Sequence, residues 1–306
     1  MTKTTRRQFL SLAMVAAAVR SLSAAELSKF RLGVTTDEID DDLRTAIQFL
    51  RRFGLHYAEV RHLWGKYNTA QPLKKIGEAR KLLDEYRIKT SIVDTSFFKV
   101  DLPADNAAGH KVIDQQWALL DRAFVRARIL GTDKIRIFGF QYAKGTQPDQ
   151  KRYPRIIELL KEAVRRAKQE RMRLALENVG RSYIATARDS ARILKAISDE
   201  RLGLTWDPNN SAASGGVRPF PEGYRLLDPA RIIHVHLRDY RHLPSGQTEW
   251  CGVGQGEFDH VGQFRALLKF GYRETFSLET HFRIDGSKAK ASEFSTKALL
   301  KKIEEV

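Results

Sequence analysis

The sequence is poor in cysteine: Cys251 is the only one in 306 residues. A single thiol excludes an intrachain disulfide and a zinc site built from several thiolates. The chain also lacks a Pro-, Gly- or Ser-rich linker, so no boundary between two halves is indicated. Although the net charge is +16, no basic cluster is interleaved with aromatic residues. Lys and Arg lie beside acids along helical segments, which is typical of solvated helix faces and gives no reason to expect a nucleic-acid partner.

The first 25 residues differ in kind from the rest. Residues 5–10 read TRRQFL, a twin-arginine pattern, and an apolar run to Val19 is followed by small residues up to Ala25. This order resembles a twin-arginine (Tat) export signal, so we expect a signal over 1–25 and a mature protein over 26–306. The apolar run is shorter than the roughly 20 residues that span a bilayer, so no stable membrane span is expected. An uncleaved tail or anchor is the alternative to export by the Tat machinery to a periplasmic or other extracytoplasmic location.

The remaining chain alternates between short β-like runs and stretches with helical spacing. The expected strands are 30–36, 57–61, 89–94, 134–140, 173–177, 202–207, 232–237 and 275–279. The expected helices are 39–53, 73–86, 110–130, 153–171, 187–197, 258–270 and 289–303, with a loop over 209–223 and a short helix at 224–227. Eight such units predict an α/β fold, a closed (β/α)8 barrel of parallel strands. A doubly wound open sheet is the alternative, but it usually carries a Gly-rich phosphate loop, which is missing here.

Four of the β-like runs end in a side chain that can bind a metal ion. RLALENVG carries Glu177, LTWDPNN carries Asp207, HVHLRDY carries His236 and SLETH carries Glu279. Because the carboxyl ends of barrel strands meet at one face, these four side chains are expected to converge. Three carboxylates and one imidazole suit one divalent ion, with Mn²⁺ or Mg²⁺ favoured and Zn²⁺ or Co²⁺ as alternatives. Without a cation the carboxylates would repel one another and take up protons.

Other polar or aromatic side chains lie at or just past the strand ends. Candidates for substrate contacts are Glu59, Arg61, Trp64, Arg136, Asn210 and Arg238. Arg238 shares the inward face with His236, where it could bind a hydroxyl or an anionic group. The alternative for these strand-end residues is packing or an internal salt bridge at the barrel mouth. His281 is a candidate for support behind the ligands, and Asp239 for orienting a ligand or a loop.

These motifs, together with YAEVRHLWGKYN, RIFGF and GVGQGEFDH, resemble the xylose isomerase-like TIM-barrel superfamily. This group of sugar (phosphate) isomerases and epimerases also includes endonuclease IV-type enzymes, and the resemblance spans all eight units. It implies a metal ion held by Glu177, Asp207, His236 and Glu279, and a small-molecule carbohydrate as partner. It also implies that Glu177 and Glu279 act as catalytic acid and base, moving a proton next to a carbonyl through an enediolate.

Three alternatives to a sugar isomerase or epimerase stay open. A lyase or hydratase would use the same groups on an oxidised sugar or keto-glycoside, and a catalytically silent barrel would only bind sugar. An endonuclease IV-like phosphodiesterase is disfavoured, because it needs a further His where Asn210 stands and an Asp-x-His where residues 248–250 read TEW. Asn210 also departs from epimerases that keep a His there. The sequence leaves open the substrate and the oligomeric state; an extracytoplasmic location would favour a free sugar or glycoside over a sugar phosphate.

Overall fold

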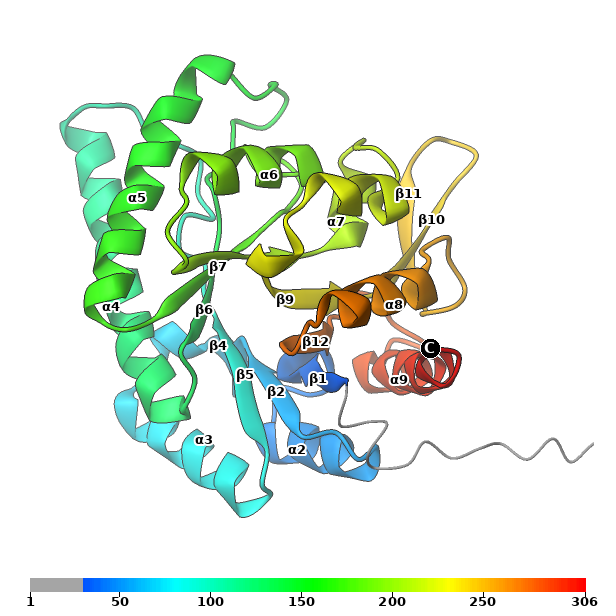
Figure 1. Cartoon of the computed structure of the whole chain (residues 1–306). Coiled ribbons are helices and arrows are strands. Elements are labelled where there is room, and N and C mark those ends of the chain that lie inside the picture. Colours follow the sequence, from blue (N-terminus) through cyan, green and yellow to red (C-terminus); the bar gives the residue numbers. More distant parts are fainter. Residues whose placement is uncertain (1–29) are drawn as a thin grey trace, which may run out of the picture.

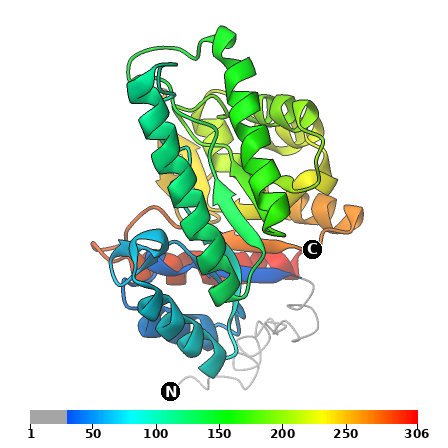
Figure 2. The same cartoon turned by 90° about the vertical axis from the view of Figure 1, so that its left-hand side faces the viewer.

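The computed structural model describes residues 30–306 (Figure 1). Residues 1–25, read above as an export signal, lie outside this range, so that interpretation stays a prediction. Parallel strands close into one barrel and helices surround it (Figures 1 and 2). The (β/α)8 architecture expected from the alternation of elements is therefore confirmed. Within the described part of the chain, none of the helices combines the length and the apolar character that crossing a membrane would take.

The barrel strands follow the order of the chain, and the last strand pairs with the first. All of their pairings are parallel. Their bounds are β1 Arg31–Thr35, β2 Tyr57–Val60, β5 Lys89–Asp94, β6 Lys134–Ile137, β7 Arg173–Glu177, β8 Leu202–Trp206, β9 Ile232–Leu237 and β12 Thr275–Leu278. Each expected strand is present, and the strand ends differ from the expected ones by a few residues at most.

Helices cover the outside of the barrel and bury their apolar faces against it. Their bounds are α2 Leu43–Arg52, α3 Leu73–Glu85, α4 Ala107–Leu130, α5 Tyr153–Gln169, α6 Ala187–Ala196, α7 Pro208–Ala213, α8 His260–Phe270 and α9 Lys288–Glu304. Short helical turns are η1 Thr36–Glu38, η2 Asn68–Ala70, η3 Gln150–Arg152, η4 Pro219–Gly223, η5 Tyr224–Leu226 and η6 Pro229–Arg231. Helix α4 shows how local signals set its ends: the Asn106 side chain accepts from the Gly109 amide, and Gly131 adopts φ 77°.

Two hairpins and one short helix add to the expected elements at the carboxyl-end face. The hairpins are β3 His62–Leu63 with β4 Lys66–Tyr67, and β10 Asp239–His242 with β11 Thr248–Cys251. Helix α7 corrects the expectation of a loop over 209–223, because it includes residues 209–213. Asn and Ser in this stretch favour turns, but the Asp207 side chain accepts from the Asn210 amide and Pro208 fits the first helical turn.

The barrel interior below the mouth is a small apolar layer made of Ile92, Ala175 and Ile233. Ile233 is an extra residue in β9, because Leu204 pairs with Ile232 and the next residue of β8 pairs with His234. Such a bulge turns one more side chain inward. Gly203 makes room for it, since a Cβ there would lie 2.7 Å from the Ile233 side chain. This layer forms an apolar floor beneath the polar side chains at the mouth.

Ion pairs lie at the amino-terminal ends of the strands, opposite the mouth. Lys134 Nζ lies 2.9 Å from Glu274 Oε2 and donates to the Ile233 carbonyl at 3.2 Å. Arg173 Nη1 donates to Glu274 Oε1 at 2.6 Å. Burial opposes ionisation of the carboxyl, but Lys134 and Arg173 lower the pKa of Glu274 to about 2. The Glu274 carboxyl is thus ionised in the folded protein at neutral pH.

Glu274→Gln is expected to lower the free energy of unfolding by about 1–2 kcal/mol at pH 7. The folded-state pKa of about 2 lies below the ordinary value of 4.5, so the stabilisation is present above pH 4.5 and is lost as the pH falls toward 2. Urea unfolding at pH 7, 5 and 3 measures this. Glu200→Gln, at an exposed carboxylate with no ion pair among residues 30–306, is the control. A stability difference that stays constant over this pH range would contradict the prediction.

Candidate active site

The four side chains expected to bind metal converge at the mouth of the barrel. Glu177 ends β7, Asp207 follows β8, His236 lies in β9 and Glu279 follows β12. All four are buried, and their ligand atoms lie within 4.8 Å of one another. His236 Nδ1 is 3.6 Å from Glu177 Oε1, 3.6 Å from Asp207 Oδ2 and 3.3 Å from Glu279 Oε2. Four neighbouring parallel strands thus deliver three carboxylates to one imidazole nitrogen.

This donor set fits a divalent cation. Two of its atoms, His236 Nδ1 and Glu279 Oε2, are buried and have no hydrogen-bond partner among residues 30–306. Buried polar atoms in proteins nearly always have a partner, and a cation would serve both at once. Oxygen ligands with one imidazole suit Mn²⁺, Mg²⁺ or Zn²⁺. The residues could therefore hold one such ion.

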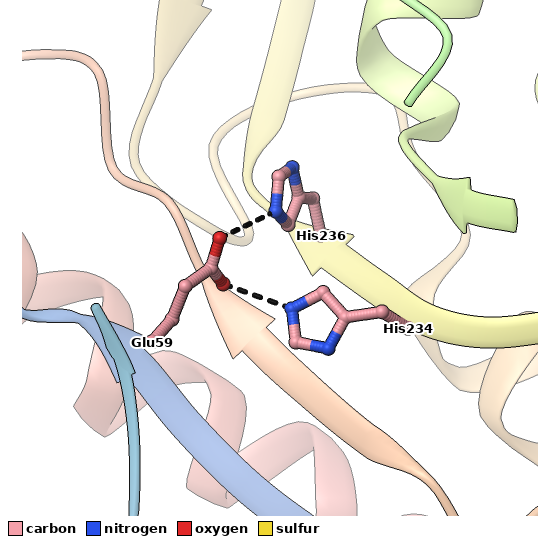
Figure 3. Close-up of side chains that lie close together, drawn as sticks. All are labelled: Glu59, His234 and His236. Carbon is pink, nitrogen blue, oxygen red and sulfur yellow. Dashed lines mark hydrogen bonds and ion pairs between the residues drawn. The ribbon is translucent and has the colours of Figure 1, made fainter. Parts of the chain in front are cut away.

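Behind His236, the Glu59 carboxylate binds two histidines (Figure 3). Its Oε1 lies 2.9 Å from His236 Nε2, and its Oε2 lies 2.9 Å from His234 Nε2. Burial lowers the pKa of His234 to about 4, so this imidazole is neutral and donates its Nε2–H. Burial acts in the same sense on His236, but the Glu59 carboxylate and the cluster carboxylates raise its pKa well above the usual range. Glu59 thereby holds the Nε2–H of His236 and leaves Nδ1 as the atom that faces the carboxylates.

Glu59→Gln is expected to weaken binding of a divalent ion about 10–100-fold, because supporting partners of a ligating histidine have effects of this size. A Gln amide accepts from one imidazole through its oxygen but presents N–H groups to the other. That would favour a proton on Nδ1 of His236, which then cannot ligate. Calorimetric titration with Mn²⁺ measures the affinity, and a thermal melt checks the fold. His234→Gln, which keeps the contact between Glu59 and His236, is the control. Equal Mn²⁺ affinity in folded Glu59→Gln and wild type would refute the positioning role.

Two arginines neutralise the glutamates of the cluster. Arg136 Nη1 lies 3.2 Å from Glu177 Oε2 and 2.9 Å from Asp94 Oδ2. Arg61 Nη1 donates to Glu279 Oε1 at 2.6 Å. Both guanidinium groups are held inside the cavity wall, so the predicted positions of Arg61 and Arg136 near the site match the structure. Asp94, the last residue of β5, is a site residue that the strand-end argument missed.

Arg238 and Asn210 form a second polar link across the site. Arg238 donates to the Asp207 carboxylate and, at 2.8 Å, to Asn210 Oδ1. Asn210 Nδ2 in turn donates to Glu177 Oε1 at 3.2 Å. The guanidinium carbon of Arg238 lies 4.4 Å from the ring centroid of Trp250 in the β10–β11 hairpin. The hairpin therefore adds an aromatic wall in a stretch for which the sequence predicts neither a strand nor a helix.

His281 and Asp239 support the site from outside. His281 Nε2 lies 3.0 Å from Glu279 Oε1, directly behind a cluster carboxylate. The Asp239 carboxylate accepts from the backbone amides of Gly254 and Phe258 at 2.9 and 3.1 Å. Asp239 thus orients the loop after β11, which was one of the two roles considered for it.

A cavity of about 770 Å³ opens above the cluster. Arg61, Arg136, Asn210 and Arg238 line it, but Glu59 and Trp64 do not. Glu59 is fully buried beneath His236, and Trp64 packs against the outer core with Lys75 Nζ 4.9 Å from its ring centroid. The wall residues that sequence reasoning did not assign include Glu38, Tyr67, Lys99, Trp250, Arg283 and Lys288. Most of them follow the carboxyl end of a strand. This position in the sequence is the signal that could have identified them as wall residues.

The fold and the cluster together define a class: a (β/α)8 barrel with a candidate metal site at the carboxyl ends of its strands. The chain belongs to the family described as Xylose isomerase-like TIM barrel, whose model matches residues 47–302. This agrees with the resemblance in the motifs. Among curated proteins, none is similar enough in sequence to count as a match.

Several solved structures share the fold. The IolI protein with a bound zinc atom has a TM-score of 0.71 at 17% identity, covering 90% of this chain and 98% of that one. A xylose isomerase-like TIM barrel protein from Mycobacterium smegmatis in complex with magnesium has a TM-score of 0.65 at 19% identity, covering 85% and 89%. D-allulose 3-epimerase from Methylomonas sp. in complex with D-allulose has a TM-score of 0.67 at 17% identity, covering 90% and 96%. At these identities the similarity establishes the fold alone.

Proposed function

We propose that this protein is a divalent-metal-dependent sugar isomerase or epimerase, which moves a proton next to a carbonyl group. The observation that carries the proposal is the pair Glu177 and Glu279, which reach one cavity from β7 and β12, with two strands between them. A protein that only binds sugar has no need for two such carboxylates around one imidazole. The zinc, magnesium and D-allulose bound by proteins of the same fold support a metal and a carbohydrate here.

Both glutamates are ionised and therefore able to accept a proton. Burial opposes ionisation, but Arg136 and His236 lower the pKa of Glu177. Burial acts likewise on Glu279, whose pKa is held well below its usual range by His281 and His236. In the proposed reaction one glutamate removes the proton from carbon. The other glutamate takes up a proton from solvent and then delivers a proton to the opposite face or to the neighbouring carbon.

The negative charge that develops on the substrate oxygens needs a nearby positive charge. A bound divalent ion, with Mn²⁺ or Mg²⁺ favoured, would supply several kcal/mol of such stabilisation. The chain's own contribution is to hold the reacting groups still. Arg136 and Asn210 fix Glu177, while Arg61 and His281 fix Glu279. Fixed groups keep the proton-transfer distance short and raise the rate.

Solvent exchange tests the proposal directly. The Mn²⁺-loaded protein is incubated in D₂O with a panel of ketoses and keto-glycosides, and the products are analysed by NMR. Deuterium at a carbon beside the carbonyl, with the carbon skeleton and substituents retained, is the expected result. Loss of a substituent would instead identify a lyase or hydratase. Binding of sugars without exchange of any proton would identify a silent sugar-binding barrel.

A further inference from the structure

The cavity wall carries more positive than negative side chains. Three glutamates line it, against six lysines and arginines: Arg61, Lys99, Arg136, Arg238, Arg283 and Lys288. Most of these cations are already paired with acids in or behind the wall. A divalent ion in the cluster would add two positive charges to the same space. Because the paired cations are already neutralised, the unpaired cations of the wall are the ones that can attract a ligand with negative charge of its own.

Lys99 and Arg283 are the two cations of this wall with no carboxylate within 4.0 Å among residues 30–306, and Arg283 Nη1 instead donates to the Gly286 carbonyl at 3.1 Å. Arg61, Arg136 and Arg238 each lie within 4.0 Å of at least one carboxylate, as does Lys288. For Lys99 no ion pair or side-chain hydrogen bond is found in residues 30–306. A solvated lysine on an outer surface would need no explanation, but this one lines the cavity that holds the cluster.

Neighbouring groups hold the Lys99 ammonium against the cavity wall. Its Nζ lies 4.7 Å from the ring centroid of buried Phe138, and the Arg136 guanidinium carbon lies 5.1 Å from the same ring. Two cations thus share one aromatic side chain. Arg136 is occupied by Asp94 and Glu177, whereas Lys99 has all three of its N–H donors available. Lys99 is exposed to the solvent that fills the cavity. An oxyanion is the group that such a free ammonium binds best.

We propose that the substrate is an anionic sugar, bearing a carboxylate or a phosphate, and that Lys99 binds this oxyanion. The sugar part rests on the function proposed above; the anionic part rests on the unpaired Lys99 in the cavity that holds the cluster. A neutral ketose would leave the ammonium facing only water. An oxyanion would gain a charged hydrogen bond and would also offset the charge of a bound divalent ion. Lys99 is therefore the residue expected to distinguish an acidic sugar from its neutral parent.

Matched pairs of ligands test this by calorimetry on the Mn²⁺-loaded protein. The probes are D-glucuronate against D-glucose and D-fructose 6-phosphate against D-fructose. The anionic member of at least one pair is expected to bind 10-fold or more tightly, with an advantage that shrinks at high salt. Lys99→Met should remove most of that advantage and leave the neutral affinity within about twofold. Lys66→Met, at an exposed lysine of the neighbouring hairpin, should change neither.

The outcomes distinguish a carboxylate from a phosphate as the source of the negative charge. They also distinguish failure of the anionic substrate from failure of the proposed isomerase function. A preference for glucuronate alone would identify a carboxylate, and one for the phosphate alone would identify a phosphate. Equal binding within both pairs, or an equal loss for both members in Lys99→Met, would overturn the anionic substrate. Anion preference without proton exchange would refute the isomerase instead. Exchange on neutral sugars only would leave the isomerase standing and remove the role of Lys99.

Discussion

Glu177→Gln and Glu279→Gln are each expected to reduce turnover by about 1,000-fold or more while the protein stays folded. Each substitution removes a base that contributes typically 10²–10⁴-fold, and Gln keeps the shape of the side chain but cannot take a proton. The fold should survive because no arginine loses its last partner. Arg136 keeps Asp94, and Arg61 keeps Asp37. Solvent deuterium exchange gives the activity, and a thermal melt gives the stability.

The controls separate loss of the base from loss of the metal. Each variant is assayed at saturating Mn²⁺, with the bound ion counted by elemental analysis. Glu249→Gln, at an exposed carboxylate of β11 that pairs with Arg241, removes a charge outside the cavity and should keep full activity. If either Glu177→Gln or Glu279→Gln retained near-wild-type turnover on a true substrate, the two-base mechanism would be wrong.

The periodicity of the sequence was sufficient to predict the barrel. Alternating strand and helix signals identified eight units, and the rule that strand ends meet at one face placed Glu177, Asp207, His236 and Glu279 together. This rule needs only the order of the strands, which the chain itself provides. It does not need the register between neighbouring strands.

The register of β2 explains why Glu59 lies deeper in the barrel than the sequence predicts. Its strand and its place near the strand end were predicted, but β2 shifts register against β5 between Ala58 and Glu59. Such an irregularity sets how deep a side chain lies in the barrel, and no single strand encodes it. Glu59 consequently lies beneath His236 instead of in the substrate wall.

Lys99 illustrates a different limit, that of loop conformation. It follows Phe98, which adopts φ 61°, a left-handed conformation that bulky residues rarely take. The amino-acid sequence gives no local signal for such a turn. Its direction depends on packing against other units, as when the Phe98 amide donates to the Gln116 side chain of α4. Residues of the loops above a barrel are therefore the part of a site that strand periodicity cannot place.

The proposed metal site leads to the second large effect. Wild-type protein is expected to carry one divalent ion per chain, and a chelator should abolish proton exchange until Mn²⁺ or Mg²⁺ is restored. Because the ion binds only the folded state, its removal should also lower stability, by about 4 kcal/mol when the ion had been present at 1,000 times its Kd. Elemental analysis and thermal melts with and without chelator measure both effects.

Asp207→Asn is the sharpest variant for this test. Asn keeps the oxygen that accepts from the Asn210 amide and starts α7, but it loses the charge that would face the ion. We expect Mn²⁺ affinity to fall at least 100-fold in a protein that is still folded. Asp228→Asn, at an exposed cap whose side chain accepts from the Ala230 amide, makes the same chemical change away from the cavity and should bind Mn²⁺ like the wild type.

Three zinc ions per wild-type chain would instead point to a phosphodiesterase, despite Asn210. No ion in protein purified without chelator, and none taken up from Mn²⁺, would refute the metal site and leave a sugar-binding barrel as the better explanation of the cavity.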